Sequence, residues 1–342
     1  MTQANAILAV MWVGITFYAL LGGADFGAGF WDLFAGSAER GRAQRDFIEH
    51  AIGPVWEANH VWLIFALVVL WTGFSAAFAA VMSTLYIPLT LAAFGVIMRG
   101  SAFAFRKAVD ELWLKRIFGA AFALSSVVTP FFLGAVAGAV ATGRVPPGNA
   151  RGNVLTSWLN PTSVLGGVLA VLVCAYLAAV YLTRDAERAH HPVLAEQFRT
   201  RALGTALVLG VVAIGGIFVL ASDAPTLFKG LTGRALPLVL ASAVFGAVSI
   251  ALLLRRRYVA VRITAALAVV AIIWGWGAGQ YPYLLEPGLT IAQAAAAPSV
   301  LTAVLVSLAF GTLILVPSMV LLFSLFQRVH LEELEHAEGG GH

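Results

Sequence analysis

The sequence predicts an all-α, polytopic membrane protein of about nine transmembrane helices, and three observations support that fold class. Of the 342 residues, 60% are hydrophobic and only 11% are charged, whereas a soluble domain of this length carries roughly 25% charged residues. Nine segments reach the ~20 mostly apolar residues that a helix needs to cross a bilayer. None of them alternates apolar and polar residues as a strand of a membrane β-barrel would.

The nine expected spans define one membrane domain over residues 1–342. Their approximate ranges are 6–33, 54–79, 81–105, 117–141, 162–183, 203–222, 235–254, 261–279 and 298–326. We expect a four-helix group over 1–141, a second over 162–279, a peripheral ninth helix over 298–327 and a polar, partly helical tail over 328–342. No sequence repeat at a fixed period supports that division. Because the first six residues carry no Lys or Arg, we expect the first apolar run to be retained as a span rather than removed as a signal peptide.

The positive charges predict how the spans are oriented. Sixteen of the 21 Lys and Arg residues lie in or beside the connections after odd-numbered spans, four lie in the other connections, and Arg99 lies inside the third span. Short loops rich in Lys and Arg stay in the cytoplasm, so we expect the amino terminus outside and the carboxyl terminus inside. The net charge of +4 is too small and too dispersed for a nucleic-acid binder. The single cysteine, Cys174, allows neither a disulfide framework nor a cysteine metal site, and we expect a small packed residue.

Three ionisable side chains lie inside the expected spans, where each costs ~2.5–3.5 kcal/mol on insertion scales and should face protein or water. Asp25 belongs to the first span, Glu57 lies near the start of the second, and Arg99 lies in the third. With the predicted orientation and a rise of ~1.5 Å per residue, all three fall within ~5–12 Å of the cytoplasmic edge of the hydrocarbon core. Consecutive spans usually pack as neighbours, so we expect one shared polar cluster.

Small residues in the first span support this cluster. Ala19, Gly23 and Gly27 repeat at every fourth residue, a pattern that lets another helix approach closely. Such an approach would shield Asp25 from lipid.

The second span adds residues that suit proton transfer. Glu57, His60, Val61 and Ile64 share a helical face, and Trp56 and Asn59 adjoin it. A carboxylate and an imidazole one turn apart suit a proton relay, because both can change charge when their environment shifts their pKa values. The alternative is a static ion pair, in which Arg99 neutralises one acid and no proton moves. We disfavour a third interpretation, His60 as a haem ligand, since a lone intramembrane histidine beside a glutamate is more often a hydrogen-bonded partner.

Three segments together resemble subunit II of the cytochrome bd-type quinol oxidases. They are Gly22–Asp32 (GGADFGAGFWD), Gly53–Leu63 (GPVWEANHVWL) and Trp274–Leu285 (WGWGAGQYPYLL), the last followed by Leu289-Thr290-Ile291. The nine-span plan matches over nearly the whole chain. The GGADFGAG form is closer to the branch that is often called cyanide-insensitive.

The resemblance implies a complex of the bacterial inner membrane in which quinol is oxidised near the outer face and oxygen is reduced to water. It places haem b and haem d in a pseudo-symmetric partner, subunit I, so this chain would bind no cofactor or metal itself. A small accessory subunit and membrane lipid are further expected partners. The sequence agrees with that division, because it lacks paired histidines or a Met/His set placed to hold haem.

The resemblance also implies roles for individual residues. By motif, Glu57 would lie on the proton route from the cytoplasm, where some family members have aspartate. Asp25 and His60 would assist, although other members have glutamine in place of His60. Arg99 would tune the acids, with Trp56 and Asn59 in support.

Two other functions remain open from the residues alone. An ion-coupled secondary transporter would bind its coupling ion between Asp25 and Glu57, but it predicts a cluster near the midplane and a repeat with inverted topology. A purely structural membrane scaffold would tolerate Glu57→Gln without loss of catalysis. A haem-bearing partner in the purified preparation would distinguish an oxidase from a transporter.

Overall fold

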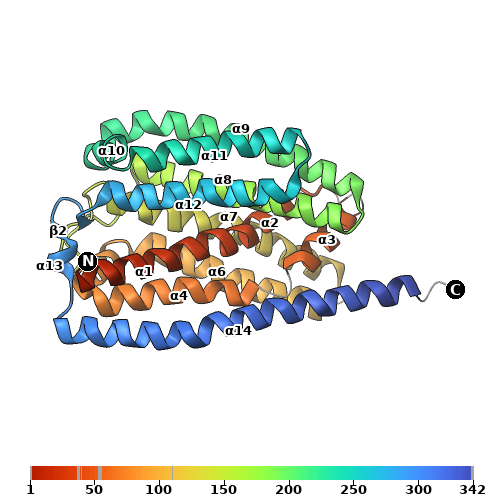
Figure 1. The fold of residues 1–342 in the computed structure, drawn as a ribbon, viewed down its shortest axis with the longest axis horizontal. Helices are drawn as coiled ribbons and strands as arrows, with labels where there is room; N and C mark the ends of the chain where they lie inside the picture. The colour runs from red at the N-terminus through yellow and green to blue at the C-terminus, as the bar shows by residue number, and fades with distance from the viewer. Residues whose placement is uncertain (1, 37–38, 40, 53–55, 110, 340–342) are drawn as a thin grey trace.

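The computed structural model describes residues 2–36, 39, 41–52, 56–109 and 111–339, and within these ranges only the backbone of residues 52, 56, 57, 106–108, 112, 322, 323 and 325–339 is described. There the chain forms a bundle of long helices with one small β-hairpin (Figure 1). In chain order the elements are α1 (Gln3–Phe17), η1 (a π-helical turn, Tyr18–Gly22), α2 (Gly23–Leu33), α3 (Arg42–Ile52), α4 (Trp56–Gly73), α5 (Ser75–Thr84), α6 (Tyr86–Ala108), α7 (Leu112–Ala141), α8 (Pro161–Arg188), α9 (Pro192–Asp223), α10 (Pro225–Thr232), α11 (Leu236–Leu254), α12 (Tyr258–Gln280), β1 (Tyr283–Leu285), β2 (Leu289–Thr290), α13 (Ile291–Ala294) and α14 (Pro298–Gly339).

The predicted all-α membrane fold is confirmed. In the described part of the chain, eight helices are long and apolar enough to cross a membrane, and the bent pair α4–α5 makes nine if it counts as one span. The helix α14 continues to Gly339, so the tail is helical as far as it is described. The division into two four-helix groups and a peripheral helix stays a prediction.

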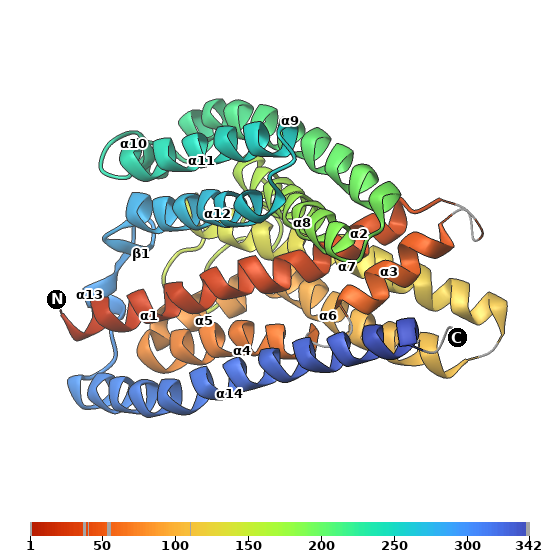
Figure 2. The same cartoon turned by 45° about the vertical axis from the view of Figure 1, so that its right-hand side comes forward.

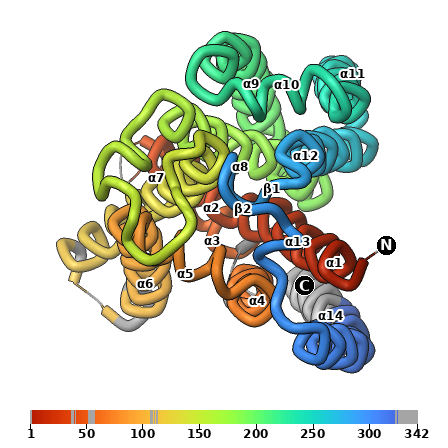
Figure 3. The backbone as a smooth tube through the Cα atoms, turned by 90° about the vertical axis from the view of Figure 1, so that its left-hand side faces the viewer, coloured from red at the N-terminus to blue at the C-terminus, as the bar shows by residue number. Residues whose placement is uncertain are grey.

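The bundle has two distinct ends. The start of α1, the short helix α10, the β1–β2 hairpin and α13 lie at one end, which we call the hairpin end, whereas α3 lies at the opposite end, the α3 end (Figures 1 and 2). Seen end-on, α14 lies at the edge of the bundle, where it contacts α1 and α4 (Figure 3). The Lys and Arg count predicts that the α3 end faces the cytoplasm.

The second span is shorter than the sequence indicates. We expected one helix over 54–79, but α4 ends at Gly73 and α5 departs at 119° from it. The break lies at Phe74, whose φ of −142° and ψ of 54° are not helical. Its ring is fully buried in the core. The bend therefore directs this aromatic side chain into the protein, at the point where a straight helix would have continued. A matching break follows α9, where Ala224 has φ −138° and ψ 61° before the short helix α10.

The small-residue pattern of the first span meets the helix α8. A Cβ atom at position 27 would overlap the carbonyl oxygen of Cys174, and one at position 23 would lie 3.5 Å from its Sγ atom. The predicted close approach of a second helix is therefore confirmed. Cys174 itself is a buried, free cysteine, as expected.

Two tryptophans join α1 to α12. Trp12 donates from its indole nitrogen to the carbonyl of Ile273 over 3.0 Å, and Trp274 donates to the hydroxyl of Thr16 over 3.2 Å. Gly277 makes room for this contact, because a Cβ there would lie 2.7 Å from the Trp12 ring. The start of the WGWGAGQYPYLL segment thus packs against protein.

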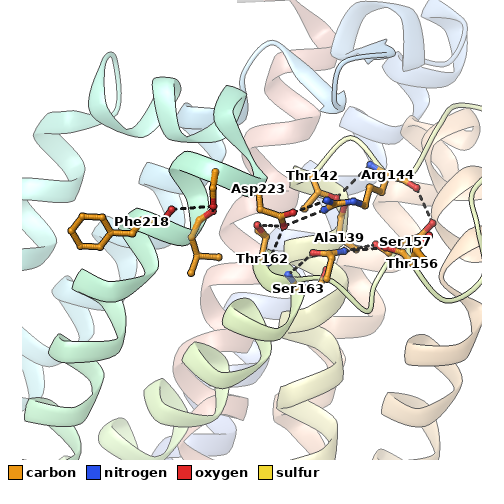
Figure 4. Close-up of polar contacts among 12 residues, drawn as sticks. Ala139, Thr142, Arg144, Thr156, Ser157, Thr162, Ser163, Phe218 and Asp223 are labelled. Carbon is orange, nitrogen blue, oxygen red and sulfur yellow. Dashed lines mark hydrogen bonds and ion pairs between the residues drawn. The ribbon is translucent and has the colours of Figure 1, made fainter.

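A polar network ties the long loop after α7 to the hairpin end (Figure 4). Arg144 donates two hydrogen bonds to Asp223, of 3.1 and 2.6 Å, and Thr162 donates to the same carboxylate from its amide (3.1 Å) and its hydroxyl (2.7 Å). Ser157 in turn donates to the Arg144 carbonyl over 2.8 Å. These contacts join the end of α9, the start of α8 and the loop between α7 and α8. The hydrogen bond to Asp223, together with the charge of that carboxylate, raises the pKa of the Arg144 guanidinium above its usual value.

The hairpin buries a carboxyl group. Glu286 lies in the turn between β1 and β2 and is 3% exposed. One of its oxygens, Oε1, has no hydrogen-bond partner among the described residues. Burial raises the pKa of this carboxyl to about 7, against the opposing effects of a hydrogen bond from Thr226 and the nearby charge of Arg234.

The close contact between α2 and α8 predicts that adding one methyl group at position 27 lowers the stability of the fold considerably. We expect Gly27→Ala to destabilise the protein by about 1–3 kcal/mol or more, because the clash is with backbone, which cannot rotate away. The measurement is thermal unfolding of the purified protein in detergent. Gly215→Ala is the matched control, since a Cβ there meets nothing within 4 Å. Equal melting temperatures for the two variants would contradict the packing described.

The buried carboxyl of Glu286 predicts a pH dependence of the hairpin. The folded state keeps a proton that the unfolded state releases between pH 4.5 and about 7, so hairpin stability is greatest below that window and falls as the pH rises through it. Hydrogen exchange of residues 283–290, corrected for the intrinsic effect of pH, measures this fall. Glu286→Gln should abolish it, and a wild-type hairpin with constant protection from pH 5 to 8 would contradict the assignment.

Candidate functional site: a buried polar cluster

A cluster of polar side chains lies inside the bundle, between four helices. Asp25 comes from α2, Asn59 from α4, Arg99 from α6 and Ser126 from α7. The side-chain amide of Asn59 donates to the Asp25 carboxylate, and Arg99 donates to the Ser126 hydroxyl and, over 2.6 Å, to the backbone carbonyl of Asp25. All are buried, with exposed fractions of 8% for Asp25 and 1% for Arg99. Asp25 and Arg99 therefore lie together inside the bundle, whereas their common depth in the membrane stays a prediction.

The Arg99 guanidinium is packed against aromatic rings inside the bundle. It lies over the rings of Phe26, 5.0 Å from the centroid, and Phe122, at 4.3 Å. Aromatic faces attract a desolvated cation by about 2 kcal/mol or more. Gly29 provides the space, because a Cβ there would overlap the Ser126 hydroxyl and lie 2.8 Å from an Arg99 nitrogen. The local sequence of α2 thus fits a buried guanidinium.

The guanidinium binds the backbone of Asp25 rather than its carboxylate. Among the described residues, no ion pair within 4.0 Å joins Arg99 to Asp25. The carboxylate is held instead by the neutral amide of Asn59. A change in the protonation state of Asp25 would therefore break no contact ion pair. The static Arg99–Asp25 pair considered from the sequence is not formed, and a pair between Arg99 and Glu57 lies outside the described residues.

His60 borders the cluster. Its ring centroid lies 5.7 Å from that of Phe26 and 6.0 Å from that of Tyr18, and the residue is half-buried. Val61 and Ile64, which share the helical face of His60, are 39% and 60% exposed in this chain. The helix α4 is rotated so that Asn59 faces α2, because that amide satisfies the buried carboxylate.

Of the six predicted site residues, the structure brings together Asp25, Asn59, His60 and Arg99. The helix α4 begins at Trp56, but the side chains of Trp56 and Glu57 lie outside the described residues. The place of Glu57 in the cluster therefore stays a prediction.

Sequence reasoning missed the contribution of α7. Ser125, Ser126 and Thr129 are 4%, 1% and 0% exposed, and they lie within an apolar span at i, i+1 and i+4. Polar residues at such spacing, on a helix next to an arginine-bearing span, are the signal that could have identified Ser126 as the partner of Arg99.

The described part of the cluster combines two titratable side chains with fixed polar groups. Its titratable members are a carboxyl group and an imidazole, surrounded by an amide, a hydroxyl and a fixed cation. Within the residues that the structure describes, no group of three or more His, Cys, Asp or Glu side chains converges on a point where it could hold a metal ion.

Comparison with known proteins gives consistent similarities. The family model described as cytochrome bd terminal oxidase subunit II matches residues 4–326. The cytochrome bd ubiquinol oxidase subunit 2 of Bacillus subtilis (strain 168) is 32% identical over 180 residues. These residues cover 52% of this chain and 51% of that protein, so the match spans about half the length of this relative. The putative cytochrome bd menaquinol oxidase subunit II of the same organism is 22% identical over 339 residues, 96% of each chain. The solved structure of bd oxidase from Geobacillus thermodenitrificans matches with a TM-score of 0.76 and 26% identity, covering 95% of this chain and 99% of the matched one.

The double role of Arg99 predicts that lysine cannot replace it. Lysine keeps the positive charge but has a single ammonium nitrogen, whereas the planar guanidinium donates to two acceptors from two nitrogens. Arg99→Lys should therefore leave the Ser126 hydroxyl or the Asp25 carbonyl without its hydrogen bond. We expect a loss of about 1–3 kcal/mol, measured as a lower unfolding temperature in detergent. Arg255→Lys is the control, because Arg255 is exposed in the connection after α11. An Arg99→Lys protein as stable as this control would contradict the geometry.

Proposed function

Because this chain belongs to the family of cytochrome bd terminal oxidase subunit II, we propose that it is the haem-free subunit of a quinol:oxygen oxidoreductase and that its Asp25 cluster supplies protons from the cytoplasm. The partner would be a subunit I that carries haem b and haem d, in a bacterial inner membrane. Quinol would be the substrate of the complex.

The observation that carries the proposal is the separation of charge in the cluster. The carboxylate of Asp25 is buried and held by the amide of Asn59, while Arg99 is satisfied by Ser126 and a backbone carbonyl. A neutral amide tolerates both protonation states of a carboxyl group, whereas a direct ion pair would hold the charged state. The Asp25 carboxyl is therefore suited to carry a proton.

The proposed route starts at the α3 end. Asp25 lies eight residues before the end of α2 at Leu33, or about 12 Å along the helix. Glu57 lies in the first turn of α4, two residues before Asn59. We assign Glu57 as the group that receives protons from the cytoplasm, with His60 and bound water between it and Asp25, and Arg99 setting the potential at the acids.

The side of the membrane from which the protons are taken decides whether the reaction moves charge across the membrane. Reduction of oxygen in the partner subunit consumes protons, and drawing them from the cytoplasm makes the reaction electrogenic. Each charge moved against 100 mV costs about 2.3 kcal/mol, which the oxidation of quinol by oxygen can supply. The proposed orientation has the hairpin end outside and the α3 end in the cytoplasm.

The exposed helices leave apolar surface for the proposed partners. On α14, Phe310 is 66%, Leu313 70% and Ile314 71% exposed, and on α9 Phe218 is 75% exposed. Surfaces of this kind face lipid or another membrane subunit. Subunit I, a small accessory subunit and lipid would share them.

The alternatives gain less support. An ion-coupled transporter with two halves would place an acidic site in the second half as well, but the buried acids of the described chain are Asp25, Asp32 and Glu286, and Glu286 lies in the hairpin turn. A structural scaffold needs no titratable group at position 25. The experiment below separates it from a proton-supplying subunit.

We expect Asp25→Asn, in the complex purified with its haem-bearing partner, to keep the haem spectrum and lower the oxygen-consumption turnover by about tenfold or more. The amide is nearly isosteric but carries no proton to the next acceptor. Glu57→Gln should act in the same direction. Asp46→Asn is the control, because Asp46 is an exposed carboxylate on α3.

Either of two results would overturn the proposal. Wild-type turnover in Asp25→Asn with intact haem would remove Asp25 from the route. Loss of the haem spectrum in both Asp25→Asn and Glu57→Gln would make the cluster a structural support for the partner.

A further inference from the structure

The helix that carries Asp25 changes its winding one turn before that residue. From Gln3 to Leu33 the first span is continuous, but Tyr18–Gly22 is a π-helical turn. Such turns are rare, interrupt the regular hydrogen-bond ladder and occur frequently at functional sites. Tyr18, at the start of this turn, has no role in the route described above.

The tyrosine ring is directed along its own helix toward Asp25. Helical aromatic side chains usually lean toward the preceding turn. The Tyr18 ring instead packs beside Gly22, four residues later, where a Cβ would lie 2.9 Å from it. Its centroid is 6.4 Å from that of Phe26 and 6.0 Å from that of His60. Gly22 therefore leaves space that brings the phenol to the edge of the polar cluster.

The Tyr18 hydroxyl is buried and has no hydrogen-bond partner among the described residues. A buried hydroxyl left unsatisfied costs about 1–3 kcal/mol, and Phe would avoid that cost while filling the same space. By contrast, the hydroxyl of Tyr176, a buried tyrosine on the neighbouring helix α8, is paired with Ser249. A hydroxyl at the cluster without a protein partner is therefore suited to a transient partner, a bound water or a proton donor.

We propose that the Tyr18 hydroxyl is the relay that takes the proton from Asp25 toward the middle of the membrane. This inference rests on the proposed function. The backbone of Tyr18 lies seven residues, or about 10 Å, closer to the hairpin end than that of Asp25, and the ring leans back toward Asp25. A proton from the α3 end therefore reaches Asp25 first. The charged and titratable side chains around the phenol are Asp25, His60, Arg99 and Cys174.

The step keeps the phenol neutral. The Asp25 carboxyl, directly or through one bound water, gives its proton to a lone pair of the phenol oxygen while the phenol releases its own proton to a second bound water on the hairpin side. One O–H bond forms as another breaks, and the hydroxyl then turns back. A nearby fixed cation, Arg99, disfavours any net positive charge on the phenol, so the two transfers are concerted.

The test uses the complex with its haem-bearing partner. Tyr18→Phe should keep the haem spectrum and lower turnover about tenfold, with the loss growing as the pH rises and protons become scarcer at the α3 end. Tyr176→Phe is the matched control and should keep the wild-type turnover and pH profile, because that hydroxyl lies outside the cluster. Gly22→Ala keeps the phenol but pushes the ring aside, and it should give a smaller loss with the same pH dependence.

The outcomes separate this inference from the function on which it rests. Wild-type turnover and pH profile in Tyr18→Phe, with Asp25→Asn impaired, would overturn the role of Tyr18 and leave proton supply through Asp25 intact. If Asp25→Asn also turns over normally, the proposed function fails as well. If Tyr18→Phe loses its haem, normal turnover in Gly22→Ala would overturn the relay and a reduced, pH-dependent turnover would support it.

Discussion

A guanidinium group buried in the middle of a helix bundle is the constraint on which the rest of this structure depends. Arg99 is 1% exposed, and a charge at that depth is costly unless donors, acceptors and polarisable groups surround it. The bundle provides a hydroxyl from α7, a backbone carbonyl from α2 and two aromatic faces. These contacts fix the relative positions of α2, α6 and α7. One glycine of α2 follows from the same requirement, since Gly29 leaves space for the group, and a second, Gly27, lets α8 pack against α2.

The buried cation also determines what Asp25 can do. Because Arg99 is satisfied elsewhere, the Asp25 carboxylate is within its field but is held by the Asn59 amide, and the proposed proton transfer depends on this arrangement. The hairpin end shows the opposite arrangement, where Arg144 and Asp223 form a direct, two-bonded ion pair that joins a loop to a helix end. The protein thus contains one direct ion pair, Arg144–Asp223, that stabilises the fold. In a second pair, Arg99 and Asp25, the two charged groups do not contact each other, as the proposed function requires.

Much of the cluster could be predicted because charges in apolar spans are conspicuous, but its geometry could not. Asp25 and Arg99 are costly in lipid wherever they lie, so the sequence alone indicates that they are shielded. The repeat that includes Gly27 shows that a helix approaches but not which one, and α8 is more than a hundred residues away. The rotation of α4 about its axis could not be predicted, because the span is apolar on every side beyond its first turns. The bend at Phe74 could not be predicted either, because the apolar run continues through it. The position of the bend depends on the burial of that ring against other helices.

The side from which protons enter tests the central claim most directly. The complex with its haem-bearing partner is reconstituted into vesicles of known orientation, reduced with quinol and given a pulse of oxygen while pH dyes report on both aqueous phases. The account predicts rapid proton uptake from the side that the α3 end faces, and its loss in Asp25→Asn. Uptake from the hairpin side, or unchanged uptake in Asp25→Asn, would contradict it.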